Sequence, residues 1–377
     1  MTARAAKAPV LHAVILAGGA GERFWPASRR HYPKPFLQVI GGKSLLESTL
    51  SRARRFAKPE NIWIVCGSEH AAAVRREAGL VRGRVLVEPQ RRNTALAIGW
   101  VSQVIASQDP NAVVAVLPAD HHIPDERAFA RDIKAAAHAA ADQHVLVTLG
   151  VKPTRPDIGY GYIQKGKATG AGHSRMHRVL RFVEKPDAAR ARRFLRGGKH
   201  LWNAGVFVWE AATLLAELER CAPDLHRAMA PLRKSRRAVR LRKSIEQTYR
   251  RAPALAIDVA VMERSKRVWT LPVDFAWSDV GTWASLAEEL GVGRPAGKRS
   301  GGGFESQGNR SIAGDILSVD SSGTLVWGKD RLVALVGVEN LAVVDTGDVI
   351  LVTKLDRSPD VRRLVAELKK RGRTNLT

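Results

Sequence analysis

The sequence predicts an α/β protein with a mixed, mostly parallel sheet, followed by a small unit rich in strands. Two observations predict this class: short apolar runs alternate with helix-length amphipathic segments over residues 14–149, and short β-branched runs recur over residues 312–353. The length of 377 residues is a third observation, because single cores usually stop growing below that size. Two domains are therefore expected.

The alternation in the first part is typical of βαβ units and a mostly parallel sheet. The run Val113–Leu117 is almost purely apolar, which is typical of a strand buried on both faces. The other predicted strands are Val14–Leu16, Ile62–Cys66, Arg84–Val87 and Val145–Leu149. The predicted helices are Ser44–Arg55, Glu69–Glu77, Thr94–Ser107 and Phe129–Asp142.

The middle of the chain mixes strands and helices, and the end changes character. Strands are predicted at Phe182–Val183, Val206–Trp209 and Val268–Leu271. Residues 294–307 are rich in Gly, Ser and Arg, which is typical of a linker. We therefore expect a domain over residues 1–293, a linker over 294–308 and a small domain over 309–377. Its predicted elements are the strands Ile316–Val319, Leu325–Trp327, Val333–Val338, Leu341–Val344 and Val349–Val352 and the helix Pro359–Gly372.

The composition excludes several classes of protein. The two cysteines, Cys66 and Cys221, have a spacing that fits neither a metal site nor a disulfide framework, so a reducing compartment is expected. The first residues carry positive charge without the apolar segment of a signal peptide, and no run approaches the roughly 18 apolar residues of a membrane span. We expect a cytoplasmic protein with no membrane partner.

The formal net charge of +25 comes from 61 Lys and Arg residues against 36 Asp and Glu residues. A nucleic-acid partner is one interpretation, since basic patches release counterions from phosphate backbones. A phosphate-rich small substrate and an Arg-rich surface without function are two others. The densest basic run, Arg233–Arg242 with Arg250 and Arg251, is interpreted as a solvated helix face. Charge alone decides nothing here, and nucleic acid stays a remote alternative.

A glycine-rich segment follows the first predicted strand. Glycines let backbone N–H groups approach phosphate oxygens closely, and Arg23 and Lys34 add two cations, which suits a triphosphate. The segment is not a Walker A loop, because no Gly-Lys-Ser/Thr follows, and it fails the dinucleotide pattern at Phe24. The alternative is a glycine turn with surface charges. The candidate residues are Ala17, Gly18, Gly19, Gly21, Arg23 and Lys34.

Two aspartates are candidates for a metal site. Asp120 follows the buried strand that ends near Leu117, and ligands bind at the carboxyl ends of strands in open α/β sheets. A carboxylate there suits Mg²⁺, which prefers oxygen ligands. Asp279, in the segment Ala276–Trp283, is a second carboxylate that could meet Asp120 across a metal. His121 and His122 raise a zinc alternative, but no third ligand lies at metal spacing.

Two further segments carry polar groups suited to a sugar phosphate. Glu184 and Lys185 end a short predicted strand; the lysine could hold a phosphate and the glutamate could accept from sugar hydroxyls. A surface ion pair is the alternative. Asn203 offers both a donor and an acceptor to a sugar. The aromatic residue Trp283 is interpreted as core packing.

Taken together and in this order, these segments resemble the monofunctional form of the GDP-mannose pyrophosphorylase (mannose-1-phosphate guanylyltransferase) family. Each motif alone is weak to moderate, but their ordered combination is specific, and the likeness spans residues 11–370. The further matching segments are Glu88-Pro89, Arg92-Asn93-Thr94, Tyr160–Ile163, Ile257–Glu263 and Gly337–Leu341.

The resemblance implies a Rossmann-like nucleotidyltransferase domain, with helices on both faces of its sheet, and a small C-terminal part like a left-handed β-helix. It implies Mg²⁺-assisted in-line attack of mannose 1-phosphate on the α-phosphorus of GTP, giving GDP-mannose and pyrophosphate without a covalent enzyme intermediate. The printed sequence does not contain the C-terminal isomerase domain of bifunctional relatives, so no isomerase activity is expected. The oligomeric state stays open, with a homodimer among the possibilities.

The resemblance also implies roles for individual residues. Arg23 would hold the triphosphate and Lys34 the α-phosphate, while Asp120 and Asp279 would hold Mg²⁺. Lys185 would hold the phosphate of the sugar. The residues implied around the sugar are Gly161, Glu184 and Asn203, and those implied near the nucleotide are Ala17, Gly18, Gly19, Gly21, Glu88, Asn93 and Thr94.

The sequence departs from the family pattern at three positions. Pro35, Leu96 and Val259 stand where the family often has Gln, Pro and Tyr. These departures put the fine substrate preference in question rather than the reaction type. The same chemistry on another sugar 1-phosphate or nucleotide is therefore the nearest alternative, and a catalytically silent sensor of nucleotide sugars is another.

Overall fold

The computed structural model describes residues 9–19, 21–79, 84–170, 173, 175–234, 238–294, 308–328 and 331–377. The chain forms two compact units, each assembled from several segments. The first unit contains Met1–Gly18, Thr49–Ala119 and Ile123–Trp277, and the second contains Gly19–Ser48, Asp120–His122 and Ser278–Thr377. Most of the predicted linker lies outside the described residues, so the division at residues 294–308 stays a prediction.

In the described part of the first unit, nine strands form one mixed sheet in the order β3-β2-β1-β4-β8-β5-β9-β7-β6. The first four strands in this order are parallel to one another, and β5 is parallel to β9. The long strand β8 runs antiparallel to both β4 and β5. The strands are β1 (Leu11–Leu16), β2 (Ile62–Gly67), β3 (Val85–Glu88), β4 (Val113–Pro118), β5 (Leu146–Val151), β6 (Tyr162–Ala168), β7 (His177–Val183), β8 (His200–Glu210) and β9 (Val268–Val273).

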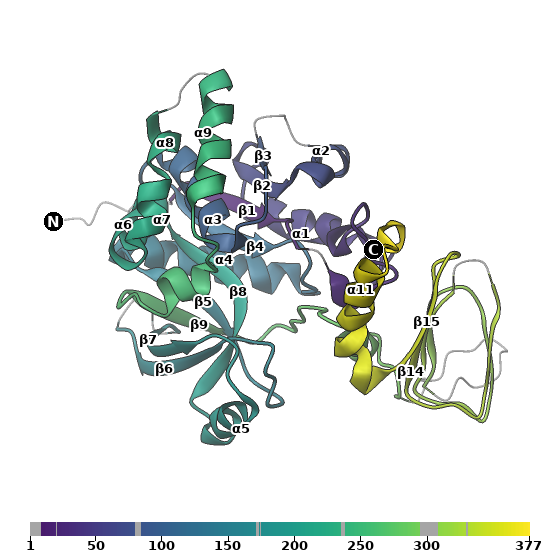
Figure 1. Ribbon diagram of the computed structural model, residues 1–377. Coiled ribbons are helices and arrows are strands. Elements are labelled where there is room, and N and C mark those ends of the chain that lie inside the picture. Colours follow the sequence, from purple (N-terminus) through teal and green to yellow (C-terminus); the bar gives the residue numbers. More distant parts are fainter. Residues whose placement is uncertain are drawn as a thin grey trace. The chain divides into compact units, whose positions relative to one another are not determined.

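Both faces of the central strand β1 are buried, as the apolar sequence predicts. Val14 packs in the main core with helix α3, while its neighbours Ala13 and Ile15 point to the opposite face and are also fully buried. Figure 1 shows α8 and α9 side by side near α3. The helices are α1 (Leu45–Arg54), α2 (Ala71–Ala78), α3 (Asn93–Ala106), α4 (Glu126–Gln143), α5 (Ala188–Gly197), α6 (Ala211–Cys221), α7 (Pro223–Ala228), α8 (Ala230–Lys234) and α9 (Ala238–Arg251).

The parallel strands bring several candidate residues to one edge of the sheet. Strands β1, β2, β3 and β4 point the same way, so their carboxyl ends meet at the same edge. Gly18 follows β1, Glu88 ends β3, and Ala119 follows β4. The strand order therefore explains why residues distant in sequence gather there.

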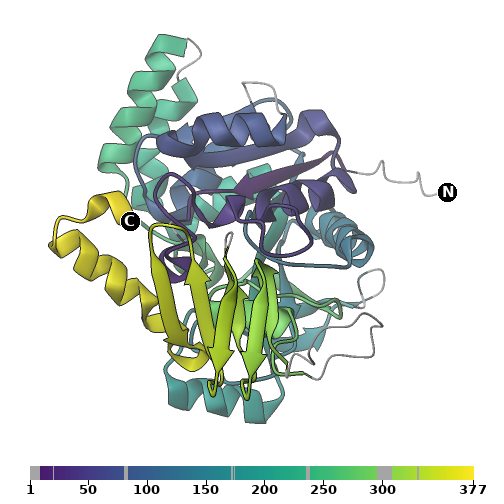
Figure 2. The ribbon, with the colours of Figure 1, turned by 90° about the vertical axis from the view of Figure 1, so that its right-hand side faces the viewer.

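The second unit contains stacked short strands that turn back on themselves (Figure 2). Strands β10, β12 and β14 pair in parallel, β15 closes this sheet antiparallel to β14, and β11 pairs in parallel with β13. Val326, Leu335 and Val343 form a small core inside the stack. The strands are β10 (Arg310–Ala313), β11 (Ile316–Val319), β12 (Leu325–Trp327), β13 (Val333–Val336), β14 (Leu341–Asp345) and β15 (Ile350–Lys354), and the helices are α10 (Trp283–Glu289) and α11 (Val361–Lys370).

The structure confirms the α/β class and the strand-rich end, with local differences. Strands β6 and β10 were not predicted, because Lys, Gln, Arg and Ser interrupt the apolar pattern of both. The predicted helix at Pro359–Gly372 is α11 preceded by a 3-10 helix, Leu355–Asp360, that contains the proline. The described residues include no helix with the length and apolarity that a membrane crossing requires.

Candidate active site

In the second unit, a short pairing of two chain segments brings Asp120 close in space to the region of Asp279. The N–H of His122 donates to the carbonyl of Ser278 at 2.9 Å, and the N–H of Ser278 donates to the carbonyl of His122 at 3.0 Å. The two hydrogen bonds form an antiparallel bridge. Asp120 precedes this bridge on one segment and Asp279 follows it on the other, so backbone pairing fixes their approach.

The ammonium group of Lys34 contacts both aspartates. Its Nζ donates to Oδ2 of Asp120 at 2.8 Å and to the backbone carbonyl of Asp279 at 2.6 Å. Lys34 begins a 3-10 helix, Lys34–Phe36, and is only 6% exposed. Because a buried ammonium is costly without partners, these two contacts explain how the lysine can be accommodated. The candidate cation and the two candidate acids therefore form one cluster.

Gly21 is required by the packing around Lys34. Its φ is +63°, and a Cβ at this position would lie 2.6 Å from Cβ of Lys34 and 2.6 Å from Oγ of Ser28. Atoms cannot approach that closely, so any side chain here would displace the lysine. In contrast, a Cβ at Gly19 would meet no atom within 4 Å. The glycine-rich segment thus has one glycine that positions Lys34 and one that leaves open space.

The charge state of Asp120 follows from its neighbours. Burial by itself would raise the pKa of this carboxyl. The charges of Lys34 and His121, together with hydrogen bonds from Lys34 and from the backbone, outweigh burial and hold the Asp120 pKa below its ordinary value. Asp120 is therefore an ionised carboxylate at neutral pH, which is the state that a metal ligand needs.

The backbone around Asp279 is strained. Oδ1 of Asp279 accepts from the N–H of Gly281 at 3.0 Å, and a Cβ at position 281 would lie 2.7 Å from Oδ2. Val280, between them, has φ +43° and is fully buried. A β-branched residue rarely occupies this left-handed region, and such strain is often held at functional sites. The local chain thus favours one fixed orientation of the Asp279 carboxylate.

The donor atoms of this cluster fit a hard divalent cation. Asp120 and Asp279 supply carboxylate oxygens, and Mg²⁺ is commonly held by one or two carboxylates together with waters and substrate phosphates. In the part of the chain that the structure describes, no group of three or more His, Cys, Asp or Glu side chains is arranged for metal binding. The zinc interpretation of His121 and His122 therefore lacks the three or four protein ligands that zinc needs. Mg²⁺ can be held by one or two carboxylates, with waters and phosphates as its other ligands.

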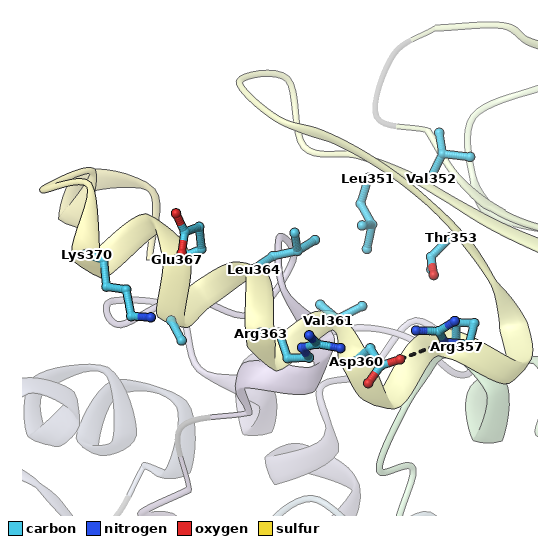
Figure 3. Close-up of a pocket in the computed structure, with 11 residues that line it drawn as sticks. Leu351, Val352, Thr353, Arg357, Asp360, Val361, Arg363, Leu364, Glu367 and Lys370 are labelled. Carbon is cyan, nitrogen blue, oxygen red and sulfur yellow. Dashed lines mark hydrogen bonds and ion pairs between the residues drawn. The ribbon is translucent and has the colours of Figure 1, made fainter.

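Two other features lie on the surface of the second unit. Arg23 lies in a 3-10 helix, Glu22–Phe24, and its side chain is exposed. An open groove of about 630 Å³ runs between β15 and α11, and Figure 3 shows the residues that line it. None of the predicted site residues lines this groove, so the groove is not a candidate for the chemistry.

In the first unit, Glu88 faces a small pocket at the carboxyl edge of the sheet. The pocket has a volume of about 110 Å³ and is lined by Gly18, by Gly67–His70 and by Glu88–Arg91. Glu88 is 9% exposed, and its Oε2 lies 3.4 Å from the position that a Cβ would take at Gly18. Burial raises the pKa of Glu88 to about 7, although a hydrogen bond from Tyr249 and the charge of Arg91 oppose this rise.

The start of helix α3 carries the other two predicted nucleotide-site residues. Asn93 has φ +61°, and its Oδ1 accepts from the N–H of Thr94 at 2.9 Å. Oγ1 of Thr94 accepts from the N–H of Ile257 at 2.9 Å. Ala17, the first residue after β1, is buried, and its N–H donates to the carbonyl of Val65 at 2.8 Å. These residues are held by backbone hydrogen bonds.

A second polar cluster of the first unit surrounds Asn203 on β8. Its Nδ2 donates to Oδ1 of Asp258 at 3.0 Å, and its Oδ1 accepts from the hydroxyl of Thr148 at 2.8 Å. The N–H of Asn203 donates to the carbonyl of Gly161 at 2.8 Å. A Cβ at Gly161 would lie 2.7 Å from Oε2 of Glu184, so glycine is needed there. The cluster unites three of the four residues that the sequence assigned to the sugar phosphate.

The fourth residue, Lys185, forms an ion pair with Glu184, which is the alternative that the sequence allowed. Its side chain is 63% exposed, so the ammonium group stays accessible to a ligand. The sequence analysis gave no role to Asp258, although it lies in the matching segment Ile257–Glu263; burial and the charge of Glu184 raise its pKa to about 6. A π-helical turn at Asp258–Met262, a feature common at functional sites, carries this carboxylate.

Comparisons with known proteins show which families the two parts of the chain resemble. Residues 12–290 match the family described as nucleotidyl transferase, and residues 314–368 match the MannoseP isomerase/GMP-like beta-helix domain. The xanthan biosynthesis protein XanB of Xanthomonas campestris pv. campestris (strain B100) is 38% identical over 97% of this chain and 74% of its own length. A mannose-1-phosphate guanylyltransferase of Escherichia coli is 35% identical over 96% of this chain and 74% of its own length.

A solved structure resembles nearly the whole chain. The crystal structure of mannose-1-phosphate geranyltransferase from Thermus thermophilus has a TM-score of 0.83 against this chain and is 34% identical to it. The likeness covers 96% of this chain and 99% of that chain. At this identity and coverage, both the α/β part and the stacked strands are shared.

Proposed function

The chain belongs to the nucleotidyl transferase family, and from this premise we propose that it transfers GMP from GTP to mannose 1-phosphate, giving GDP-mannose and pyrophosphate. The observation that carries the proposal is the contact of Lys34 with the Asp120 carboxylate and with the backbone carbonyl of Asp279, since a buried cation beside two acidic residues suits a triphosphate and a divalent ion. The similarity to an Escherichia coli mannose-1-phosphate guanylyltransferase supports the choice of substrates.

The reaction is an in-line displacement at the α-phosphorus of GTP. A phosphate oxygen of mannose 1-phosphate forms the new bond to the α-phosphorus while the bond from that phosphorus to the pyrophosphate oxygen breaks. Lys34 holds the α-phosphate and offsets the negative charge that develops there. Arg23 holds the triphosphate, the open space at Gly19 gives it room, and Gly21 positions Lys34. Catalysis on this scheme consists of positioning and charge stabilisation.

The nucleotidyl transferase family generally uses a divalent metal ion. We propose Mg²⁺, with Asp120 and Asp279 as the protein side chains that would hold it, because a small oxygen-preferring ion suits two carboxylates and a triphosphate. When bound, the ion supplies positive charge that neutralises the triphosphate and the leaving pyrophosphate. The ionised state of Asp120, maintained by Lys34, keeps one of these carboxylates ready to bind a cation.

In the first unit we propose that Glu88 selects the nucleotide base. An ionised carboxylate offers acceptors for the two donors on the edge of guanine, N1–H and N2–H, whereas adenine presents no N1–H donor. Ala17, Gly18, Asn93 and Thr94 would contribute to the same nucleotide site. For the sugar phosphate we propose Lys185 as the phosphate contact, with Gly161, Glu184 and Asn203 around the sugar.

The test is a pyrophosphate-release assay with Mg²⁺ present. GTP and mannose 1-phosphate should give rapid release; GTP with glucose 1-phosphate, ATP with mannose 1-phosphate, and samples treated with a chelator should give slow release. Faster release with another sugar 1-phosphate or nucleotide would move the assignment to the same chemistry on that substrate. Absence of release with every pair, from protein whose melting curve shows a folded state, would contradict the proposal.

A further inference from the structure

Helix α9 contains a buried tyrosine, although the basic sequence of the helix predicts a solvent-exposed face. The helix reads AVRLRKSIEQTYRR, yet Tyr249 is fully buried within the main core. Its ring packs edge-on against Trp100 of α3, with ring centroids 6.0 Å apart. A buried tyrosine hydroxyl needs a polar partner, and here the partner is the carboxylate of Glu88.

The two oxygens of the Glu88 carboxylate have different surroundings. Oε1 accepts from the hydroxyl of Tyr249 at 3.0 Å. Oε2 lies beside Gly18, at 3.4 Å from the position of a Cβ there, on the pocket of about 110 Å³. A carboxylate is planar, so fixing one oxygen restricts the rotation of the whole group. The tyrosine therefore controls the direction in which the second oxygen points.

The backbone of Tyr249 holds the same loop from a second side. Its carbonyl accepts from Nε2 of Gln90 at 2.5 Å and from Nε of Arg92 at 2.6 Å. Together with the hydroxyl contact to Glu88, one residue of α9 thus contacts the last residue of β3 and two positions of the segment between β3 and α3. This arrangement is more than packing, since each tie is directional.

We infer that Tyr249 is a positioning residue that sets the preference for guanine over adenine by orienting the Glu88 carboxylate toward the Gly18 pocket. The inference rests on the proposed function, in which Glu88 accepts hydrogen bonds from guanine. Tyr249 itself touches neither base nor phosphate; it acts through Glu88.

The protonation of Glu88 gives the inference a readout that a purely structural role would not move. The groups that face Glu88 are the hydroxyl of Tyr249 from α9, Arg91 from its own loop and Cys66 from β2, while Glu69 and His70 line the same pocket. Burial raises the Glu88 pKa, and the hydrogen bond from the tyrosine favours the ionised form and opposes that rise. Without the hydroxyl, the pKa moves further up and the carboxylate is lost at a higher pH.

The experiment is equilibrium dialysis of GTP and ATP against the full chain with Mg²⁺, as a function of pH. In Tyr249→Phe, we expect the Kd for GTP near neutral pH to rise about tenfold and the Kd for ATP to stay unchanged, because a hydrogen bond to a charged group is lost. The pH at which GTP binding weakens should move to a higher value. Glu88→Gln and the double variant Glu88→Gln/Tyr249→Phe complete a cycle in which the tyrosine change has no further effect.

Tyr162→Phe is the matched control, because Tyr162 is also a buried tyrosine whose hydroxyl donates a hydrogen bond, here to the backbone carbonyl of Asp157. Tyr162 lies on β6, at the other end of the sheet from β3. It should leave the ratio of the two Kd values unchanged. Equal weakening of GTP and ATP in Tyr249→Phe, an unchanged ratio, or the same effect in the Glu88→Gln background would overturn the inference. Because dialysis does not require turnover, its result is distinguishable from failure of the pyrophosphate-release assay, which concerns the proposed function.

Discussion

Substituting Gly21 by alanine tests whether the position of Lys34, rather than its mere presence, is needed for turnover. The change adds one methyl group and no charge. The added Cβ would lie 2.6 Å from Cβ of Lys34, 2.6 Å from Oγ of Ser28 and 3.3 Å from the Lys34 backbone nitrogen. Lys34 must shift to relieve this overlap, and its Nζ must then leave Asp120 or Asp279.

Gly41 provides a control for the backbone cost alone. Its φ is +66°, almost the same as the +63° of Gly21, but a Cβ at Gly41 would meet nothing within 4 Å. A left-handed residue with a side chain costs roughly 1–2 kcal/mol, so Gly41→Ala should destabilise the protein by that amount. Gly21→Ala should add about 1–3 kcal/mol for overpacking. The difference between the two variants isolates the push on Lys34.

The two variants should separate more clearly in turnover than in stability. A displacement of catalytic groups by about 1 Å costs roughly 100-fold in rate, so we expect Gly21→Ala to lose about that factor in kcat while Gly41→Ala keeps near-native kcat. Pyrophosphate release and thermal unfolding of both variants in the same buffer give the two quantities. Equal kcat and equal melting temperature for the two variants would refute the role assigned to Gly21 and weaken that of Lys34.

Three further predictions address the other candidate residues. Asp120→Asn and Asp279→Asn should each lower kcat with Mg²⁺ by about 1,000-fold in protein that still folds, although Asp120→Asn should also lower the melting temperature because buried Lys34 loses its charged partner. A near-native rate would remove that residue from the proposed metal pair. Lys185→Ala should raise the KM for the sugar phosphate about tenfold with little change in kcat, and an unchanged KM would leave only its ion pair. Burial raises the pKa of Glu88 to about 7, so the carboxylate gains a proton below that pH. The KM for GTP should therefore rise about tenfold per pH unit below pH 7 and stay constant above it. A constant KM from about pH 6 to about pH 8 would contradict this prediction.

The α/β order was predictable from the sequence because it follows from local patterns, whereas the pairing of Asp120 with Asp279 was a hypothesis that only the family resemblance supported. Apolar runs such as Val113–Leu117 become β4 almost residue for residue, and strand ends are where polar groups gather in parallel sheets. The contact of Lys34 with Asp120 was not predictable in this way. The two residues are 86 positions apart, and the bridge between His122 and Ser278 that holds their surroundings has no apolar signature.

The roles of Tyr249 and Asp258 were not predicted for a different physical reason. Tyr249 lies among basic residues of α9, whose charge suggested a solvated face, yet one face of that helix is buried and carries the tyrosine into the core. Asp258 lies in a π-helical turn, whose i to i+5 spacing does not match the periodicity used to recognise helices. In both cases a polar group is buried by an element that the pattern of apolar residues in the sequence does not predict.

The chain has a large positive charge, so the number of Lys and Arg residues does not identify the cation that acts in the site. Burial and contact partners are more informative. Among the described residues, Lys34 and Arg52 are both buried cations, with exposed fractions of 6% and 2%. Arg52 donates to the hydroxyl of Thr49 one turn away in α1, and burial lowers the pKa of its guanidinium to about 10. Lys34 instead donates to a carboxylate and a carbonyl from distant segments. Burial alone therefore does not identify the cation of the site; Lys34 is distinguished because its ammonium group joins the two segments that carry the candidate metal ligands, which suits a triphosphate.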